Sequence, residues 1–346
     1  MAHAFPSPWC GQGPNDVVLA TLPAYGLYQQ QTRHLGGKFV AFGHGTKVPT
    51  PEALREVFRA TNVGSVRVRA LVLCYPNNPT GAVLDDSEAA ALCQTLDELY
   101  DEYGYATDPA GGFSVILDEV YTGITADSHV SLLQHAGERL RRSILLVLSC
   151  SKGLGAMPGA RAAWITCDAA VVPELTKVQA SCTGNACTVS QAGLEANLNY
   201  LCENPAVMDA TWSYYRDRTG RVVRRLNEIG AKHGLGAVAE EPKGAFYVWA
   251  DFSKLPRVVG KSLTDVELAA YFRGLHEVGG RCGVATVPGS AFDVSGGDLR
   301  LRLSCAREDL ADLDRAMDAI DFGVAALRAD DPRHPEGHGN ARGKAE

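Results

Sequence analysis

The sequence lacks any apolar run long enough to cross a bilayer. Its first residues also lack a basic segment followed by an apolar core, the pattern of a secretory leader. Positive charge is not in excess, because 40 Asp and Glu outweigh 33 Lys and Arg and give a net charge of −7. This balance argues against nucleic acid or an acidic membrane as a partner. We therefore expect a cytoplasmic protein that binds neither.

Cysteine pairs with metal-ligand spacing are also missing. The ten cysteines are dispersed and none forms a CxxC pair. Several, including Cys74, Cys150 and Cys305, lie in apolar segments, where small buried thiols are common. His334 and His338 lie in a polar, Pro- and Gly-rich tail that is typical of solvated chain. We expect reduced cysteines and no metal site.

The length and patterning predict a two-domain α/β protein. The chain has 346 residues, 46% of them hydrophobic and 21% charged, which is ordinary for a globular protein but more than one core usually holds. Strand-like and helix-like segments alternate, a pattern that favours a mainly parallel sheet with helices on both faces. The expected strands are 17–22, 38–42, 69–75, 114–118, 144–149 and 161–166, and the expected helices include 86–104, 129–141 and 187–203.

The expected domain organisation follows from these segments. We expect an irregular N-terminus (1–16), a large domain (17–205), a small α+β C-terminal domain (206–327) and a disordered tail (328–346). A long helix at about 207–232 would bridge the two domains. The small domain would hold strands near 236–240, 245–250, 283–287 and 299–304, with helices near 264–278 and 307–327.

The most informative segment runs from Ser149 to Arg161. It places Lys152 three residues after Ser149 and continues through a Gly- and Pro-rich turn to the arginine. Such a turn presents backbone N–H groups, a hydroxyl and a guanidinium to one anion, with an amine beside them. An amine beside a phosphate site suits pyridoxal 5′-phosphate (PLP), whose aldehyde forms a Schiff base with lysine. Taken alone, the segment is more typical of a solvated loop.

Two upstream segments favour the PLP interpretation. An apolar run at 70–74 ends in Tyr-Pro-Asn-Asn-Pro-Thr-Gly, and a second run ends at Asp118 with Tyr121 three residues later. Each alone is compatible with a turn that ends a strand. In open α/β sheets, however, ligands bind at the carboxyl ends of the strands, which lie together. The three segments therefore predict one site.

These motifs resemble those of the class I/II aminotransferases, PLP-dependent enzymes of fold type I. Asn78–Gly81 matches the family's Asn-Pro-Thr-Gly, Asp118 to Tyr121 its Asp-x-x-Tyr, and Ser149 to Lys152 its Ser-x-Ser-Lys. Weaker matches extend the resemblance from about 17 to about 325. They are segment 22–28, which is similar to the family's Pro-x-aromatic segment, the segments 244–247 and 287–292, and an arginine motif around Arg302.

The resemblance implies a role for each matched residue. Lys152 would bind PLP and move a proton during catalysis, and Asp118 would pair with the pyridine nitrogen. The remaining cofactor contacts would be Tyr121 and Asn78 on the ring oxygen, Ser149 and Arg161 on the phosphate, and Tyr25 on the ring face. Arg302 would bind the substrate carboxylate, with Asn78 also beside the substrate. As alternatives, Tyr25 is an ordinary core aromatic, and Arg302 is a surface arginine that alternates with Arg300.

The resemblance also implies cis peptide bonds at Leu22–Pro23 and Asn78–Pro79, and a homodimer. Two departures stand out. Lys152 and Arg161 are nine positions apart, one more than the commonest family spacing. Only sixteen residues precede Val17, where the family has a first sheet strand and a Gly-rich turn that binds the phosphate. We therefore expect segment 161–166 to lie at the sheet edge, and PLP to be held weakly.

The expected activity is transfer of an amino group between an L-amino acid and a 2-oxo acid. Lyases and synthases of the same fold, of the C–S lyase or cyclopropane-forming type, share the cofactor residues and remain an alternative. A truncated relative with little activity is a third possibility. The motifs do not specify which amino acid is used.

Overall fold

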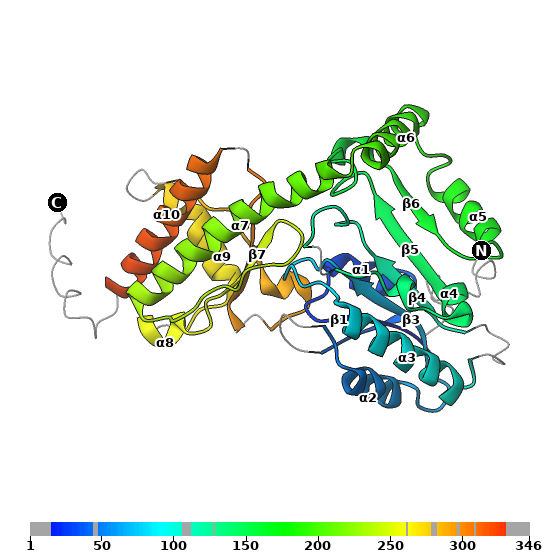
Figure 1. Ribbon diagram of the computed structural model, residues 1–346. Helices are drawn as coiled ribbons and strands as arrows, with labels where there is room; N and C mark the ends of the chain where they lie inside the picture. The colour runs from blue at the N-terminus through cyan, green and yellow to red at the C-terminus, as the bar shows by residue number, and fades with distance from the viewer. Residues whose placement is uncertain are drawn as a thin grey trace. The chain divides into compact units, whose positions relative to one another are not determined.

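The computed structural model describes residues 15–43, 48–105, 112–126, 129–260, 262–277, 282–295, 298–307 and 309–329 (Figure 1). The chain forms two compact units. The first runs to Tyr214 and includes Lys243–Ala245, and the second comprises Tyr215–Pro242 and the chain from Phe246. The boundary between the units lies within the long helix α7 (Ala206–His233), nine residues after the expected end of the large domain at 205. No helix in the described ranges is long and apolar enough to cross a membrane.

A six-stranded sheet organises the first unit. Its strands lie in the order β2-β1-β3-β4-β5-β6, and all neighbours are parallel except β5 and β6. The mainly parallel sheet predicted from the sequence is confirmed. The strands are β1 (Asp16–Thr21), β2 (Lys38–Phe42), β3 (Arg67–Cys74), β4 (Ser114–Asp118), β5 (Ile144–Ser149) and β6 (Ala163–Thr166).

Helices cover both faces of this sheet (Figure 1). Alternate residues of a strand point to opposite faces, so β1 contributes to two separate cores. Val17 and Leu19 belong to a cluster with side chains of α2 (Pro51–Thr61) and α3 (Asp86–Glu102). Val18 and Ala20 belong to another cluster, against which Tyr28 of α1 (Gly26–His34) packs. Both faces of the central strands are therefore buried, which explains their nearly continuous apolar sequences.

The edge of the sheet at β6 is exposed. Segment 161–166 was expected at an edge, and β6 is the terminal strand of the sheet among the described residues. Ile165 of this strand is 44% exposed. The helices that follow are also poorly covered: α5 (Val172–Cys182) has no buried residue, and α6 (Thr188–Glu203) buries only Leu201.

Three sequence expectations about this unit and the next are wrong. Of the strand expected at 283–287, only residue 287 is in a strand, the short Val287–Pro288. The helix expected at 129–141 is instead a 3-10 turn, η3 (Leu132–Gln134), followed by the short α4 (Glu138–Ser143), because extended Gly137 separates them. The strand expected at 236–240 is irregular in the structure. There the side chain of Asn227 accepts from the N–H groups of Val238 and Ala239 and donates to the carbonyl of Ala239, replacing a neighbouring strand.

The second unit is a small α+β fold. Its antiparallel sheet has the order β7-β9-β8, formed by β7 (Tyr247–Asp251), β9 (Arg300–Ser304) and the short β8 (Val287–Pro288). The core of this unit combines strand residues with side chains of α7, α8 (Leu255–Val259), α9 (Asp265–Gly274) and α10 (Leu310–Ala329). Of the expected tail, 328–329 continue α10, and 330–346 lie outside the described residues.

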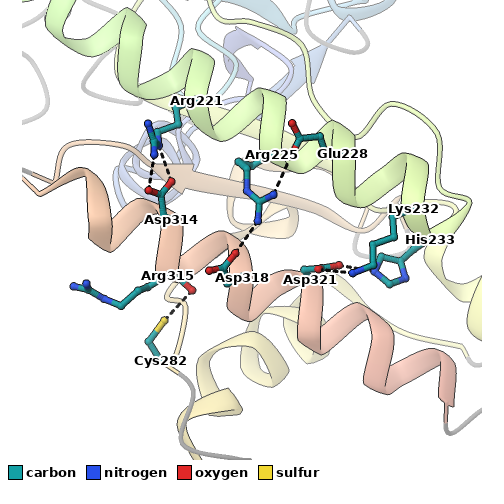
Figure 2. A network of polar contacts seen from close by, with 10 residues as sticks. All are labelled: Arg221, Arg225, Glu228, Lys232, His233, Cys282, Asp314, Arg315, Asp318 and Asp321. Carbon is teal, nitrogen blue, oxygen red and sulfur yellow. Dashed lines mark hydrogen bonds and ion pairs between the residues drawn. The ribbon is translucent and has the colours of Figure 1, made fainter.

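Ion pairs join α7 to α10 (Figure 2). Arg221 binds both carboxylate oxygens of Asp314 at 2.6 Å, and Arg225 donates to Asp318 at 2.7 Å. Further along, Lys232 and His233 both contact Asp321 at 2.7 Å. The acids and bases recur at helical spacing, so they lie on the facing sides of the two helices.

Candidate active site

The loop after β4 carries two of the predicted site residues. Asp118 is the last residue of β4, and the N–H of Glu119 donates to the carbonyl of Val147 on β5 at 3.1 Å. The chain then turns, because Thr122 N–H donates to Glu119 O at 3.0 Å and Ile124 N–H donates to Tyr121 O at 2.9 Å. These bonds fix Tyr121, which is buried, just beyond the end of the strand.

The loop after β5 brings Lys152 to Tyr121. The Lys152 Nζ atom lies 5.9 Å from the centroid of the Tyr121 ring. The two loops touch at Gly153, where a Cβ atom would lie only 1.8 Å from Thr122 O. Only glycine allows this approach without displacement of the backbone. The structure thus brings Lys152 and Tyr121 close together at the carboxyl ends of β4 and β5.

Asp118 lies in a partly buried polar cluster, in which Asp118 and Tyr28 are half-buried and Cys74 is buried. The Tyr28 hydroxyl donates a short hydrogen bond to its Oδ2 atom, and Cys74, the last residue of β3, is its partner in the sheet. Burial raises the pKa of Asp118, while the bonds from Tyr28 and the Val120 N–H oppose that rise. Burial and the neighbouring Asp118 raise the pKa of the Cys74 thiol. The site therefore holds a desolvated carboxylate, which a cationic partner would stabilise.

Asn78 is buried in the loop that follows β3. This loop contains cis peptide bonds at Tyr75–Pro76 and Asn78–Pro79, and a third occurs at Leu22–Pro23. The two that were expected are confirmed, and the one at Tyr75–Pro76 was not expected. The N–H groups of Lys243 and Gly244 donate to Gly81 O at 3.0 and 2.9 Å.

The same short segment also holds the loop after β4. Ala245 N–H donates to Ile124 O at 2.8 Å, and Gly244 forms an isolated bridge with Thr125. A Cβ atom on Gly244 would lie 2.6 Å from Pro76 Cβ. The loops that carry Asn78 and Tyr121 are therefore held together by one strap, residues 243–245.

Ser149 and Arg161 lie at the junction of β5 and β6. The Ser149 hydroxyl donates to Ala162 O at 3.2 Å and accepts from Ser151 N–H at 3.1 Å. Arg161 follows the 3-10 turn η4 (Pro158–Ala160), has a positive φ of 51° and donates to Pro158 O at 2.8 Å. Since Ser149 pairs with Ala163, both predicted phosphate ligands lie at the same end of β5 as Lys152.

Tyr25 and Arg302 are placed by different units. Tyr25 is 37% exposed and contacts Tyr28 edge to face at 5.7 Å, so it is not a core aromatic. Arg302 belongs to β9 of the second unit. Its guanidinium lies 4.3 Å from the ring centroid of Tyr247 and 5.2 Å from that of Phe292. Arg302 therefore lies against an aromatic surface of its own unit, unlike a solvated surface arginine.

The sequence analysis missed Tyr28, Cys74 and Glu119. Glu119 is buried, accepts a 2.6 Å hydrogen bond from Ser131, and has its pKa raised to about 7, chiefly by burial. The sequence contained one hint for Cys74 and Glu119: both lie next to, or a few residues from, predicted site residues in the chain. Tyr28 lies three residues after Tyr25, on the same side of a helical first turn. Within the described ranges, no group of three or more His, Cys, Asp or Glu is arranged to hold a metal ion.

Comparison with known proteins identifies the family. The model of the aminotransferase class I and II family matches residues 8–320. Aspartate aminotransferase of Pyrococcus horikoshii is 27% identical over 302 residues, which are 85% of this chain and 66% of that protein. LL-diaminopimelate aminotransferase of Desulforudis audaxviator is 29% identical over 248 residues, or 70% of this chain and 56% of that protein. The chain thus spans just under two thirds, or less, of the length of these two relatives.

Solved structures show the same fold. Aspartate aminotransferase from Thermus thermophilus with maleate superposes with a TM-score of 0.72 at 24% identity, covering 93% of this chain and 73% of that one. A single mutant of the Thermus thermophilus enzyme gives a TM-score of 0.71 at 26% identity, with the same coverage. Because the family model matches nearly the whole chain and the motif residues meet at the sheet's carboxyl edge, this chain belongs to the aminotransferase class I and II family.

Proposed function

We propose that the chain is a PLP-dependent transaminase that moves an amino group between an L-amino acid and a 2-oxo acid. One observation carries the proposal: Lys152 and Tyr121 meet beside strand β4, which ends at Asp118, a half-buried residue whose carboxyl pKa is raised by burial. The names of the relatives, which are aminotransferases for aspartate, prephenate or diaminopimelate, support it.

The residues present fit PLP. A carboxylate whose pKa is raised by burial lacks solvation, and the protonated nitrogen of a pyridine ring would supply the missing positive charge. An amine lies in the neighbouring loop, and a hydroxyl and a guanidinium follow at the end of the same strand. When bound, PLP supplies an electron sink for the charge that develops at the substrate Cα.

Each residue has a separate task in this proposal. Lys152 binds the cofactor and, once freed, carries a proton on its Nζ atom. Asp118 holds the ring nitrogen protonated, while Tyr121 and Asn78 donate to the ring oxygen. Ser149 and Arg161 bind the phosphate, and Tyr25 stacks on the ring. Arg302 binds the substrate carboxylate, because its planar guanidinium matches two oxygens at once.

Assembly and location are part of the proposal. We infer a homodimer, which the exposed apolar side chains of Val172 and Val189 on α5 and α6 support, because a partner would cover them. A cytoplasmic location is supported by the nine described cysteines, all of which are free thiols. The lyase and synthase alternatives share the cofactor residues, but the relatives named above are all aminotransferases.

A direct experiment tests the proposal. The purified chain is titrated with PLP and the visible absorption band of lysine-bound PLP is recorded. We expect the band in the wild type and in Lys177→Ala, a control at an exposed lysine, and its loss in Lys152→Ala. Amino acids are then offered with 2-oxo acids, and the transferred amino group is measured together with released ammonia or thiol. Absence of the band contradicts the proposal, and release without transfer favours a lyase.

A further inference from the structure

We propose that Tyr28 is a positioning residue for Asp118: its hydroxyl holds one carboxylate oxygen and leaves the other for the ring nitrogen of PLP. This inference rests on the proposed function, since it names a residue that prepares the same site. Tyr28 ends the segment that resembles the family's Pro-x-aromatic motif, but the resemblance assigned it no role.

The position of Tyr28 is fixed by its surroundings. It lies in the first turn of α1, where its N–H donates to Tyr25 O at 3.0 Å and its carbonyl accepts from the Thr32 hydroxyl at 2.7 Å. Its ring packs against the core cluster that includes Val72 of β3 and Ile116 of β4. The hydroxyl is therefore held at the carboxyl ends of these strands, where Asp118 lies.

The two oxygens of Asp118 are used unequally. Oδ2 accepts the short bond from Tyr28, whereas Oδ1 accepts from the Val120 N–H at 3.4 Å, a long and weak contact. A carboxylate has several lone-pair directions, so Oδ1 retains room for a strong, charge-assisted donor. The bond to Oδ2 sets the rotation of the carboxylate and thereby the direction in which Oδ1 points.

The electrostatic surroundings make Tyr28 a donor rather than an anion. Burial, Cys74 and Asp118, in that order, raise the pKa of Tyr28, so its hydroxyl keeps its proton at physiological pH. Among the described residues, Cys74 on β3 and Glu119, which follows Asp118, also act on this cluster. Neither is a cation. The Tyr28 hydroxyl is therefore the side-chain donor that opposes the rise in the pKa of Asp118 caused by burial.

Tyr28 also contacts the residue proposed to stack on the cofactor. The rings of Tyr25 and Tyr28 meet edge to face, with centroids 5.7 Å apart and planes at 83°. This arrangement is favourable for aromatic pairs. One side chain thus contacts both the carboxylate for the ring nitrogen and the aromatic ring beside the cofactor.

The test uses Tyr28→Phe, which removes the hydroxyl and keeps the ring. The dissociation constant of PLP is measured by titration of the visible band between pH 5 and 9. We expect Tyr28→Phe to weaken binding about tenfold or more, because it removes a hydrogen bond to a charged group. The loss should grow as pH falls, since Asp118 then protonates more readily. Tyr105→Phe, which keeps its ring and loses a buried hydroxyl bonded to Asn62 near the start of β3, should change binding less than about threefold.

Two further measurements separate positioning from packing. In an Asp118→Asn background, Tyr28→Phe should change the dissociation constant less than about twofold, because the two residues act through one bond. A tenfold loss in that background, or no loss in the single variant, overturns the proposal. In the apoprotein, the infrared band of the protonated carboxyl group, assigned with Asp118→Asn, should titrate at higher pH in Tyr28→Phe. An unchanged titration overturns the proposal even if PLP does not bind, whereas a wild type that lacks the visible band refutes the proposed function alone.

Discussion

The Ser131 hydroxyl donates a 2.6 Å hydrogen bond to Glu119 Oε1, joining the residue after β4 to the start of η3. The bond thus joins two residues that lie on either side of Tyr121 in the chain. Burial raises the pKa of Glu119 to about 7, although the bond from Ser131 opposes the rise. Glu119 is thus a titratable group near neutral pH, directly next to the carboxylate of the site.

The first prediction concerns the pH dependence of stability. Between its ordinary pKa of 4.5 and about 7, Glu119 holds its proton more tightly in the folded chain than in the unfolded one. Stability contributed by this group therefore falls as pH rises through that window, by about 3 kcal/mol in total. Glu119→Gln stays neutral and can still bind Ser131. We expect the variant to be the more stable protein at pH 8 and to match the wild type near pH 4.5, as measured by urea unfolding.

His129 makes a contribution of the opposite sign. Burial lowers its pKa to about 4, so its effect is to raise stability as pH increases from about 4 to its ordinary 6.5. His129 is present in both the wild type and Glu119→Gln. The difference between their free energies of unfolding therefore reports on Glu119 alone. Glu195→Gln, at an exposed position on α6, is the matched control for the loss of a carboxylate and should change stability at pH 8 by less than about 0.5 kcal/mol. The prediction is contradicted if the difference in free energy of unfolding between the wild type and Glu119→Gln does not change with pH.

The second prediction concerns the contact between the Tyr121 and Lys152 loops. Gly153→Ala places a Cβ atom 1.8 Å from Thr122 O, so the two backbones must separate. We expect a loss of about 2 kcal/mol in stability and a weakened visible band of bound PLP, because Lys152 moves away from the site. Thermal unfolding and PLP titration measure the two effects. Gly159→Ala, where an added Cβ meets nothing within 4 Å, should leave both nearly unchanged.

The third prediction ranks two ion pairs between α7 and α10. Although burial opposes it, bonds from Lys232 and His233 lower the pKa of Asp321. The side chain of His233 is only 5% exposed, and Asp321→Asn weakens the hydrogen bond of this buried imidazole. We expect the variant to lose about 2 kcal/mol of stability at pH 7. Asp318, whose side chain is 58% exposed, pairs with Arg225 in solvent. Asp318→Asn should therefore cost about 0.5 kcal/mol. Equal losses in urea unfolding would show that burial does not set the strength of these pairs.

The sequence predicted the parallel sheet well because its central strands are buried on both faces. Each such strand contains a continuous apolar run that stops at a polar loop or residue, as at 70–74 in β3 and 115–117 in β4, so its place and its end are visible in the sequence. The secondary structure of segments with a weak hydrophobic pattern was harder to predict. The irregular stretch at 236–240 has an apolar pattern, and its backbone is satisfied by Asn227, a distant side chain that no local pattern reveals.

For the site, too, some residues could be predicted from the sequence and others could not. Lys152, Tyr121 and Asp118 stand at strand ends within recognisable motifs, and the structure brings the loops that carry them together. Tyr28 reaches Asp118 from a helix ninety residues earlier in the chain. Since such a contact depends on the packing of α1 against the sheet, the sequence offers only the spacing from Tyr25 as a hint.

The last prediction concerns the exposed edge at β6. An edge strand presents unpaired N–H and C=O groups, and an apolar one invites pairing with another chain. Ile165 on β6 is 44% exposed, and the neighbouring helix α5 buries no side chain. Ile165→Lys places a charge on this edge and should reduce concentration-dependent self-association, measured by sedimentation velocity. Leu35→Lys makes the same change at a residue that is 45% exposed but lies beyond α1, and it should not. If both variants associate like the wild type, self-association does not use the β6 edge, and the exposed faces of α5 and α6 become the surfaces to test next.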